Sequence, residues 1–77
     1  MIELVLPKWG LTMEAEVLEW LKREGDLITA SEPLVVVETD KANAEVEAPV
    51  SGRLTRIVAS VGAVVAPGDV LGEIEVE

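Results

Sequence analysis

Short runs rich in β-branched residues recur along this chain between Gly, Pro, Asp and Ser. We count eight such runs: Ile2–Leu6, Ala15–Leu21, Leu27–Ile28, Leu34–Thr39, Ala44–Glu47, Arg53–Val58, Val64–Val65 and Val70–Val76. Short runs at such spacing are typical of an all-β sandwich or barrel. In "AEVEA" (44–48) and "EIEVE" (73–77) the alternation predicts half-buried strands, with Ile74 and Val76 facing the core.

One segment, 14–24, has a high helix propensity when it is considered alone. An internal repeat argues against a helix there. A shift of 37 positions aligns Val17, Leu34 and Val37 with Leu54, Leu71 and Ile74, and Gly25 with Gly62. The segment then aligns with "GRLTRIVAS", a poorer helix former, so we expect strands in both halves. We predict one domain over residues 1–77, a flattened β-barrel or sandwich of two four-stranded antiparallel sheets with pseudo-two-fold symmetry.

Composition excludes several classes of function. The chain has 77 residues, no Cys and no His, which removes thiol nucleophiles, zinc sites and the usual proton shuttle at neutral pH. No calcium loop is recognisable either. A net charge of −9 argues against binding to nucleic acid or to an anionic membrane. The longest apolar stretch, 57–66, is far shorter than the roughly 20 residues of a spanning helix, and no secretory signal is visible, so we expect an intracellular protein.

The stretch "VVVETDKANAEV" (35–46) places Asp40 and Lys41 at the tip of a predicted hairpin. Two-residue hairpin loops favour Asn-Gly or Asp-Gly, whereas a type I turn closed by Asn43 in the left-handed region would also be allowed. Lys41 has no counterpart in the second half of the repeat, because that half ends at Glu77. We therefore expect the Lys41 hairpin to project from the end of the domain opposite both termini.

Four motifs, which together cover most of the chain, resemble one family. "LPKWGLTMEAEVLEWLKREGD", "PLVVVETDKA", "APVSGRLTRI" and "PGDVLGEIEV" are similar to the lipoyl domains of 2-oxo acid dehydrogenase complexes. The resemblance implies a barrel-sandwich hybrid fold and lipoic acid in amide linkage on Lys41. An amine on a rigid, projecting tip suits a swinging carrier, and the cofactor supplies sulfur chemistry that this protein lacks.

The resemblance also implies partners and recognition residues. The partners are a thiamine-diphosphate-dependent decarboxylase, an acyltransferase core, a dihydrolipoyl dehydrogenase and a lipoate-protein ligase, in a prokaryotic cytoplasm or a mitochondrial matrix. The isolated domain is expected to be monomeric and to belong to an acyltransferase chain. The implied recognition residues are Glu38, Asp40, Ala42 and Gly25, with Gly52 as a structural turn glycine and Trp9 and Leu11 in a loop that selects the decarboxylase.

Several of these assignments carry further expectations. For Gly25 and Gly52 a backbone role in turns is the expected reason for the residue type. For the loop, the alternative is that Trp9, Leu11 and Met13 only cap one end of the core. The loop "PKWGLTM" favours a pyruvate or acetoin system. Because lipoylation would remove the lysine charge, Glu38, Asp40 and Glu45 are hypothesised to form an acidic collar that the decarboxylase reads.

Other functions remain open at this point. A biotinyl domain would share the architecture, although its motif places Met on both sides of the lysine. The lipoyl carrier of glycine cleavage is longer than this chain. Lys41 could also be an ordinary solvated turn lysine in an interaction module. An enzyme is disfavoured, because pairs such as Glu73 and Glu75 have no acid-base partner.

Overall fold

The computed structural model describes residues 1–8, 14–40 and 42–77. Eight strands are present: β1 (Ile2–Val5), β2 (Ala15–Trp20), β3 (Leu27–Ile28), β4 (Pro33–Glu38), β5 (Asn43–Glu47), β6 (Gly52–Ile57), β7 (Val64–Val65) and β8 (Val70–Val76). Each of the eight predicted runs is confirmed as a strand, with ends that differ by one residue at most. Among residues 1–8, 14–40 and 42–77 there is no helix long and apolar enough to cross a membrane.

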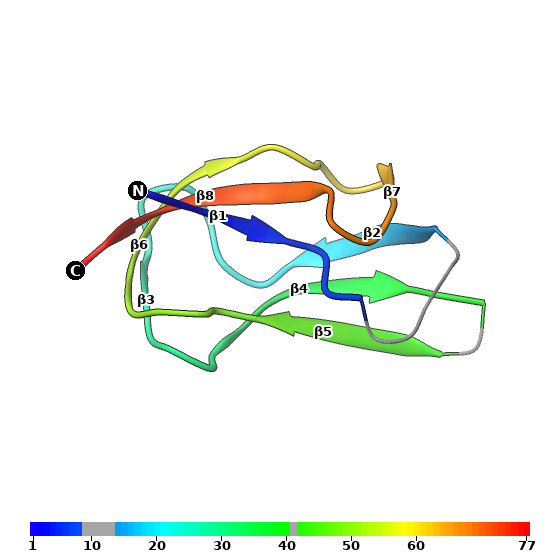
Figure 1. The fold of residues 1–77 in the computed structure, drawn as a ribbon, viewed down its shortest axis with the longest axis horizontal. Coiled ribbons are helices and arrows are strands. Elements are labelled where there is room, and N and C mark those ends of the chain that lie inside the picture. The colour runs from blue at the N-terminus through cyan, green and yellow to red at the C-terminus, as the bar shows by residue number, and fades with distance from the viewer. Residues whose placement is uncertain (9–13, 41) are drawn as a thin grey trace.

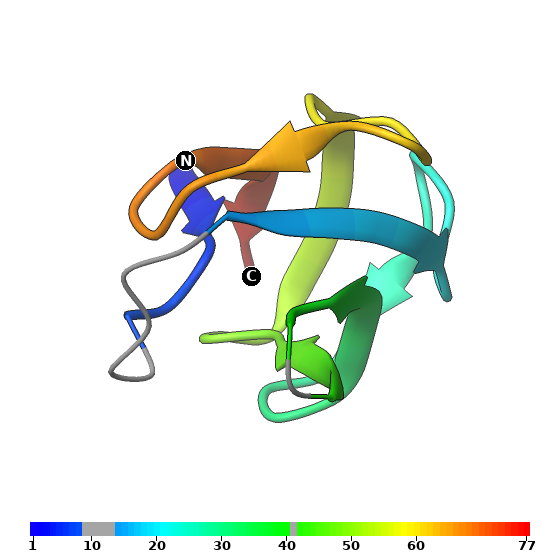
Figure 2. The same cartoon turned by 90° about the vertical axis from the view of Figure 1, so that its right-hand side faces the viewer.

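The strands form two four-stranded antiparallel sheets, ordered β1-β8-β6-β3 and β5-β4-β2-β7. The two sheets pack as layers of one small barrel-like sandwich, seen from the side in Figure 1 and from one end in Figure 2. Both termini lie at one end of the molecule, and the β4–β5 connection lies at the other (Figure 1). The predicted fold class and the predicted position of the hairpin are therefore confirmed.

The predicted pseudo-two-fold extends to individual hydrogen bonds. The Val17 amide donates to the Ala63 carbonyl at 2.9 Å, and the Leu54 amide, 37 positions later, donates to the Asp26 carbonyl at 2.9 Å. Register shifts also match, since β2 and β6 each bulge at the same point of the repeat, between Val17 and Glu19 and between Leu54 and Arg56. The segment 14–24 thus contains strand β2, because pairing with β4 and β7 outweighs its helix propensity.

The core lies between the two sheets and is aliphatic. Its largest fully buried side chains are Leu6, Leu34, Leu54, Leu71, Ile74, Val17, Val35, Val37 and Val46. The prediction for Val76 is wrong, because this side chain is 47% exposed whereas Ile74 is fully buried. Val76 pairs with Gly52 at the end of its sheet, where the partner residue has no side chain to cover it.

Ser31 is the only described residue other than glycine with a positive φ, at 72°. Its counterpart in the repeat is Gly68, with a φ of 93°. A left-handed conformation is costly for a residue with a Cβ, so we expect Ser31→Gly to stabilise the domain by about 0.5–1 kcal/mol after the entropy cost of glycine. Chemical denaturation measures this difference. Gly68→Ser is the reciprocal control, and it should destabilise the domain; a stabilised Gly68→Ser would contradict the explanation.

Candidate functional site at the β4–β5 hairpin

Strands β4 and β5 are joined by a very short connection. Their register pairs Val37 with Ala44 and Glu38 with Asn43. One step beyond the strand ends, the Thr39 amide donates to the Ala42 carbonyl at 3.0 Å, so positions 40 and 41 lie beyond this bond. Lys41 itself lies outside the described residues. The structure therefore brings the residues on either side of Lys41 to the end of a regular hairpin (Figure 2).

The hairpin is closed by a side chain. The Thr39 hydroxyl donates to the Ala42 carbonyl at 2.7 Å, and the Ala42 amide donates to the Thr39 hydroxyl at 3.2 Å. The structure does not adopt the allowed alternative in which Asn43 closes a type I turn in the left-handed region, because Asn43 is the first residue of β5 and has no positive φ. A bond across the hairpin makes that conformation unnecessary. Thr39 was not among the predicted site residues, because its only signal in the sequence is its position just before the tip.

The predicted recognition residues next to the tip are accessible. Glu38, Asp40 and Ala42 are all exposed. Glu38 lies directly opposite Glu16 on the adjacent strand β2, so two carboxylates are cross-strand neighbours. Because like charges at opposed positions repel, this arrangement does not serve stability.

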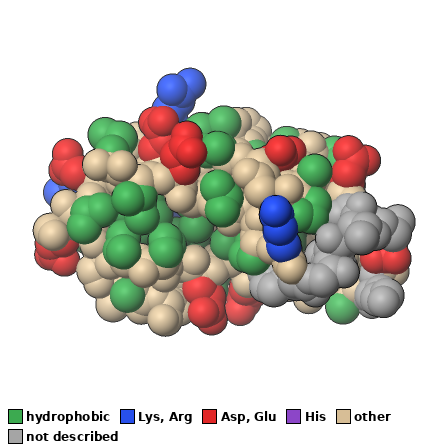
Figure 3. All heavy atoms as spheres, viewed as in Figure 1, with side chains coloured by type: hydrophobic (Ala, Val, Ile, Leu, Met, Phe, Trp, Pro, Cys, Tyr) green, Lys and Arg blue, Asp and Glu red, His purple; other side chains and the backbone are tan. Residues whose placement is uncertain are grey.

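Glu16 belongs to a larger acidic face on the sheet β5-β4-β2-β7. We define this acidic face by its exposed carboxylates, Glu16, Glu19, Glu38, Glu45 and Glu47. Figure 3 shows acidic side chains along its lower edge, where β5 runs in Figure 1, and others along its upper edge. Arg53 and Arg56 of the other sheet occupy the positions of the repeat that Glu16 and Glu19 occupy here, and Arg53 lies opposite Glu75 in the strand register. The two sheets thus have the same arrangement of strands but differ in surface charge, and the more acidic sheet carries the β4–β5 hairpin.

The two predicted glycines have different structural reasons. Gly25 has a φ of 95° in the β2–β3 connection, and its amide donates to the Leu54 carbonyl at 2.6 Å. Gly52 is the first residue of β6, where a Cβ would collide with the Glu75 carbonyl oxygen. A close approach of two backbones, and not a left-handed turn, requires glycine at this position. Neither glycine is part of the hairpin, while Trp9 and Leu11 lie outside the described residues.

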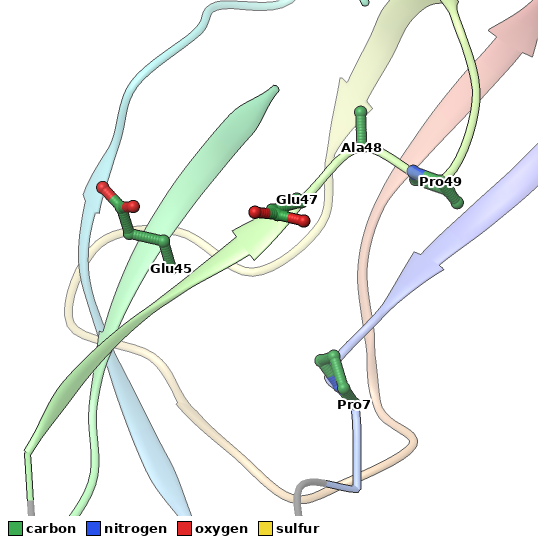
Figure 4. A pocket seen from close by; sticks show the side chains of 5 residues that line it. All are labelled: Pro7, Glu45, Glu47, Ala48 and Pro49. Carbon is green, nitrogen blue, oxygen red and sulfur yellow. The ribbon is translucent and has the colours of Figure 1, made fainter. Parts of the chain in front are cut away.

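A shallow groove runs beside β5. It has a volume of about 420 Å³ and is lined by Pro7, Glu45, Glu47, Ala48 and Pro49. In Figure 4 the two carboxylates extend from β5, and Pro7 stands across from them at the end of the segment that follows β1. No buried polar or charged side chain is found among the described residues, so this groove offers no enclosed group that would hold a ligand.

The sequence matches a known family over almost its full length. A family model described as "Biotin-requiring enzyme", which covers biotin and lipoyl attachment, matches residues 2–74. The chain belongs to the biotin/lipoyl attachment family. A solved member supports the lipoyl branch: the lipoyl domain of the 2-oxoglutarate dehydrogenase complex from Azotobacter vinelandii aligns with a TM-score of 0.76 and 30% identity, over 97% of this chain and 96% of that chain. The resemblance seen in the four motifs is confirmed, and the chain is a lipoyl-type carrier domain.

Curated relatives of this lipoyl domain are acyltransferase components. Over 57 residues it is 54% identical to the dihydrolipoyllysine-residue acetyltransferase component of the acetoin cleaving system of Pseudomonas putida, covering 73% of this chain and 15% of that protein. The corresponding component of Cupriavidus necator is 49% identical over 72 residues, covering 92% and 19%. The succinyltransferase component of the Rickettsia bellii 2-oxoglutarate dehydrogenase complex is 35% identical over 74 residues, covering 95% and 18%. The lipoyl domain thus spans less than a fifth of the length of these relatives.

Proposed function

We propose that Lys41 carries lipoate in amide linkage and that this domain moves an attached acyl group between enzymes. The observation that carries the proposal is the β4–β5 hairpin, which stands at the end of the domain opposite the termini and has two exposed residues, Asp40 and Ala42, on either side of the lysine (Figure 1). These flanking residues differ from the Met residues expected around a biotinyl lysine. The names of the curated relatives, dihydrolipoyllysine-residue acyltransferases, support the same choice.

The hairpin suits a carrier because of its rigidity and its exposure. Strand pairing without a register shift, from Val35 to Glu38 and from Asn43 to Val46, holds the base of the loop, while Asp40 and Ala42 are exposed. A rigid support reduces the range of positions that an attached arm must search. When bound, lipoate supplies a disulfide that accepts an acyl group together with two electrons, a chemistry for which the cysteine-free chain has no group of its own.

We propose further that the partners are those of an acetoin-cleaving system. Identity is 54% and 49% to the two acetoin components, compared with 35% to 40% to the 2-oxoglutarate components and 41% to a pyruvate dehydrogenase component. The proposed partners are a thiamine-diphosphate-dependent decarboxylating or cleaving enzyme, an acyltransferase core, a dihydrolipoyl dehydrogenase and a lipoate-protein ligase. Reductive acylation assays with the purified first enzymes of acetoin, pyruvate and 2-oxoglutarate systems would rank the substrates.

The attachment is tested by mass spectrometry. The folded domain is incubated with ATP and lipoate plus lipoate-protein ligase, or with ATP and biotin plus biotin ligase. A single lipoyl addition, mapped by peptide analysis to Lys41, is the expected result. A biotinyl addition in place of a lipoyl one would assign the domain to the biotin branch of the family. No addition by either ligase to a folded sample would leave Lys41 as an ordinary turn lysine and the domain as an interaction module.

The acidic face is expected to contribute to recognition by the enzyme that acylates the arm. Glu16 now joins the collar proposed from sequence, because it lies opposite Glu38. We expect Glu16→Lys, Glu38→Lys, Asp40→Lys and Glu45→Lys each to raise the KM for reductive acylation about three- to tenfold at low salt, with a smaller effect at high salt, because surface charges act through screened attraction.

The matched control is Glu3→Lys. Glu3 of β1 is the counterpart of Glu45 of β5 in the other sheet. Glu3 lies opposite Glu73 and Glu45 lies opposite Val36, and positions 36 and 73 are equivalent in the repeat. Reversal of the Glu3 charge should leave the KM unchanged. Unchanged reductive acylation in all four variants, the three in the acidic face and Asp40→Lys beside it, would reject the recognition role.

A further inference from the structure

The first residue of the loop that carries Lys41 does not have the backbone conformation typical of so short a hairpin. Two-residue loops normally need positive φ at both central residues or at the first one, because that twist matches the twist of the strands. Here the first loop residue is Asp40, and among the described residues other than glycine only Ser31 has a positive φ. The loop therefore does not begin as one of the favoured hairpin turns, and its closure needs another source of stability.

Thr39 supplies that closure from its side chain. In a hydrogen-bonded pair of an antiparallel ladder, each residue donates its backbone N–H to the C=O of the other. The Thr39 amide makes its half of this exchange with the Ala42 carbonyl at 3.0 Å. The hydroxyl adds a bond to the same carbonyl at 2.7 Å and accepts the Ala42 amide at 3.2 Å. One side chain thus binds both backbone groups of the residue that follows the lysine.

We propose that Thr39 is a positioning residue for the modified lysine, because its hydroxyl clamps β5 to β4 at the base of the loop. The inference rests on the proposed function of Lys41. With the clamp closed, a modifying enzyme meets one arrangement of the hairpin. Without it, only a fraction of the molecules has the competent arrangement, and the apparent affinity falls by that fraction.

The test removes the hydroxyl and keeps the shape. Thr39→Val retains a β-branched side chain at a half-exposed strand end, so the variant should fold. We expect the KM of the domain for lipoate-protein ligase to rise about tenfold with little change in kcat, because one or two hydrogen bonds of ordinary strength are lost. Hydrogen exchange of the Ala42 amide, measured by NMR, should accelerate by a similar factor. Thr39→Ser, which keeps the hydroxyl, should restore both quantities to within about twofold of the original protein.

A matched control lies in the other sheet. The Thr55 hydroxyl donates to the Glu73 carbonyl at 3.1 Å, so Thr55→Val removes a comparable hydroxyl far from the hairpin. It should change neither the ligase KM nor the Ala42 exchange rate. Melting temperatures of all variants establish that each is folded, and Thr39→Ala repeats the test with a smaller side chain.

The outcomes separate this inference from the proposed function. Faster Ala42 exchange with an unchanged ligase KM would overturn the positioning role while leaving lipoylation at Lys41 intact. Unchanged Ala42 exchange in Thr39→Val would show that the clamp does not hold the loop, and it would overturn the inference as well. Failure of the original domain to be lipoylated would overturn the proposed function and, with it, the positioning role.

Discussion

A Lys41→Arg variant is expected to take up no lipoate in the ligase reaction. Amide formation needs a side-chain amine that can lose a proton and attack an acyl donor, whereas the arginine guanidinium stays protonated in proteins. Arginine keeps the positive charge and a similar length, so the fold and the long-range field of the domain should not change. Intact mass after incubation with ligase, ATP and lipoate measures the result directly, and the expected effect is complete loss.

The chain offers two control lysines for this experiment. Lys22 lies in the β2–β3 connection, with its Nζ 3.4 Å from Glu32 Oε2, and Lys8 follows β1. Lys22→Arg and Lys8→Arg should be lipoylated as completely as the original domain, because neither residue is at the β4–β5 hairpin. Lipoyl addition to the Lys41→Arg variant at any other amine would contradict the assignment of the attachment site.

Gly52→Ala is expected to destabilise the domain by about 3 kcal/mol, at the upper end of the usual cost of overpacking. A Cβ at this position would collide with the Glu75 carbonyl oxygen of β8, which is backbone and cannot move aside as a flexible side chain would. For a domain of this size the melting temperature should fall by roughly 15 °C. Thermal and chemical denaturation of the unmodified domain give both quantities.

Ala15 provides the matched comparison for Gly52. It occupies the equivalent position of the repeat, 37 residues earlier, and its methyl group is accommodated in the core at 2% exposure. Ala15→Gly should cost only about 1 kcal/mol, the usual cost of glycine within a strand. Equal losses in the two variants would contradict a steric requirement at Gly52 and would point to a general cost of exchanging these residues.

The two sheets of this domain are nearly symmetric in their strand pairing, but only one of them carries the Lys41 hairpin and the acidic face. β1 pairs with β8 as β5 pairs with β4, with a register shift at the equivalent point of each pair. In one half the paired strands are joined by the Lys41 hairpin, and in the other half they end at the two chain termini. The acidic face adds a second difference, because Glu16 and Glu19 replace the arginines of the other sheet.

Much of the fold could be predicted from sequence because it depends on local pattern and on the repeat. The runs of β-branched residues, their turn signals and the alternation in "AEVEA" predict strands from residues close together in the chain. The repeat identifies the segment 14–24 as a strand despite its helix propensity, and it predicts that the hairpin and the termini lie at opposite ends. The motif around Lys41 indicates the proposed attachment position without any structure.

Other properties depend on which residues face each other across space, and sequence alone did not determine these. The register of β2 and β4 sets Glu16 opposite Glu38, and the close approach of β6 and β8 excludes a side chain at Gly52. Val76 is exposed because the sheet ends beside it, although the alternation predicts burial. The closure of the hairpin by Thr39, in place of Asn43, is of the same kind. Alternation along one strand predicts which face of the sheet a residue occupies. Only the packing of the two sheets determines which residue lies opposite it and whether other side chains bury it.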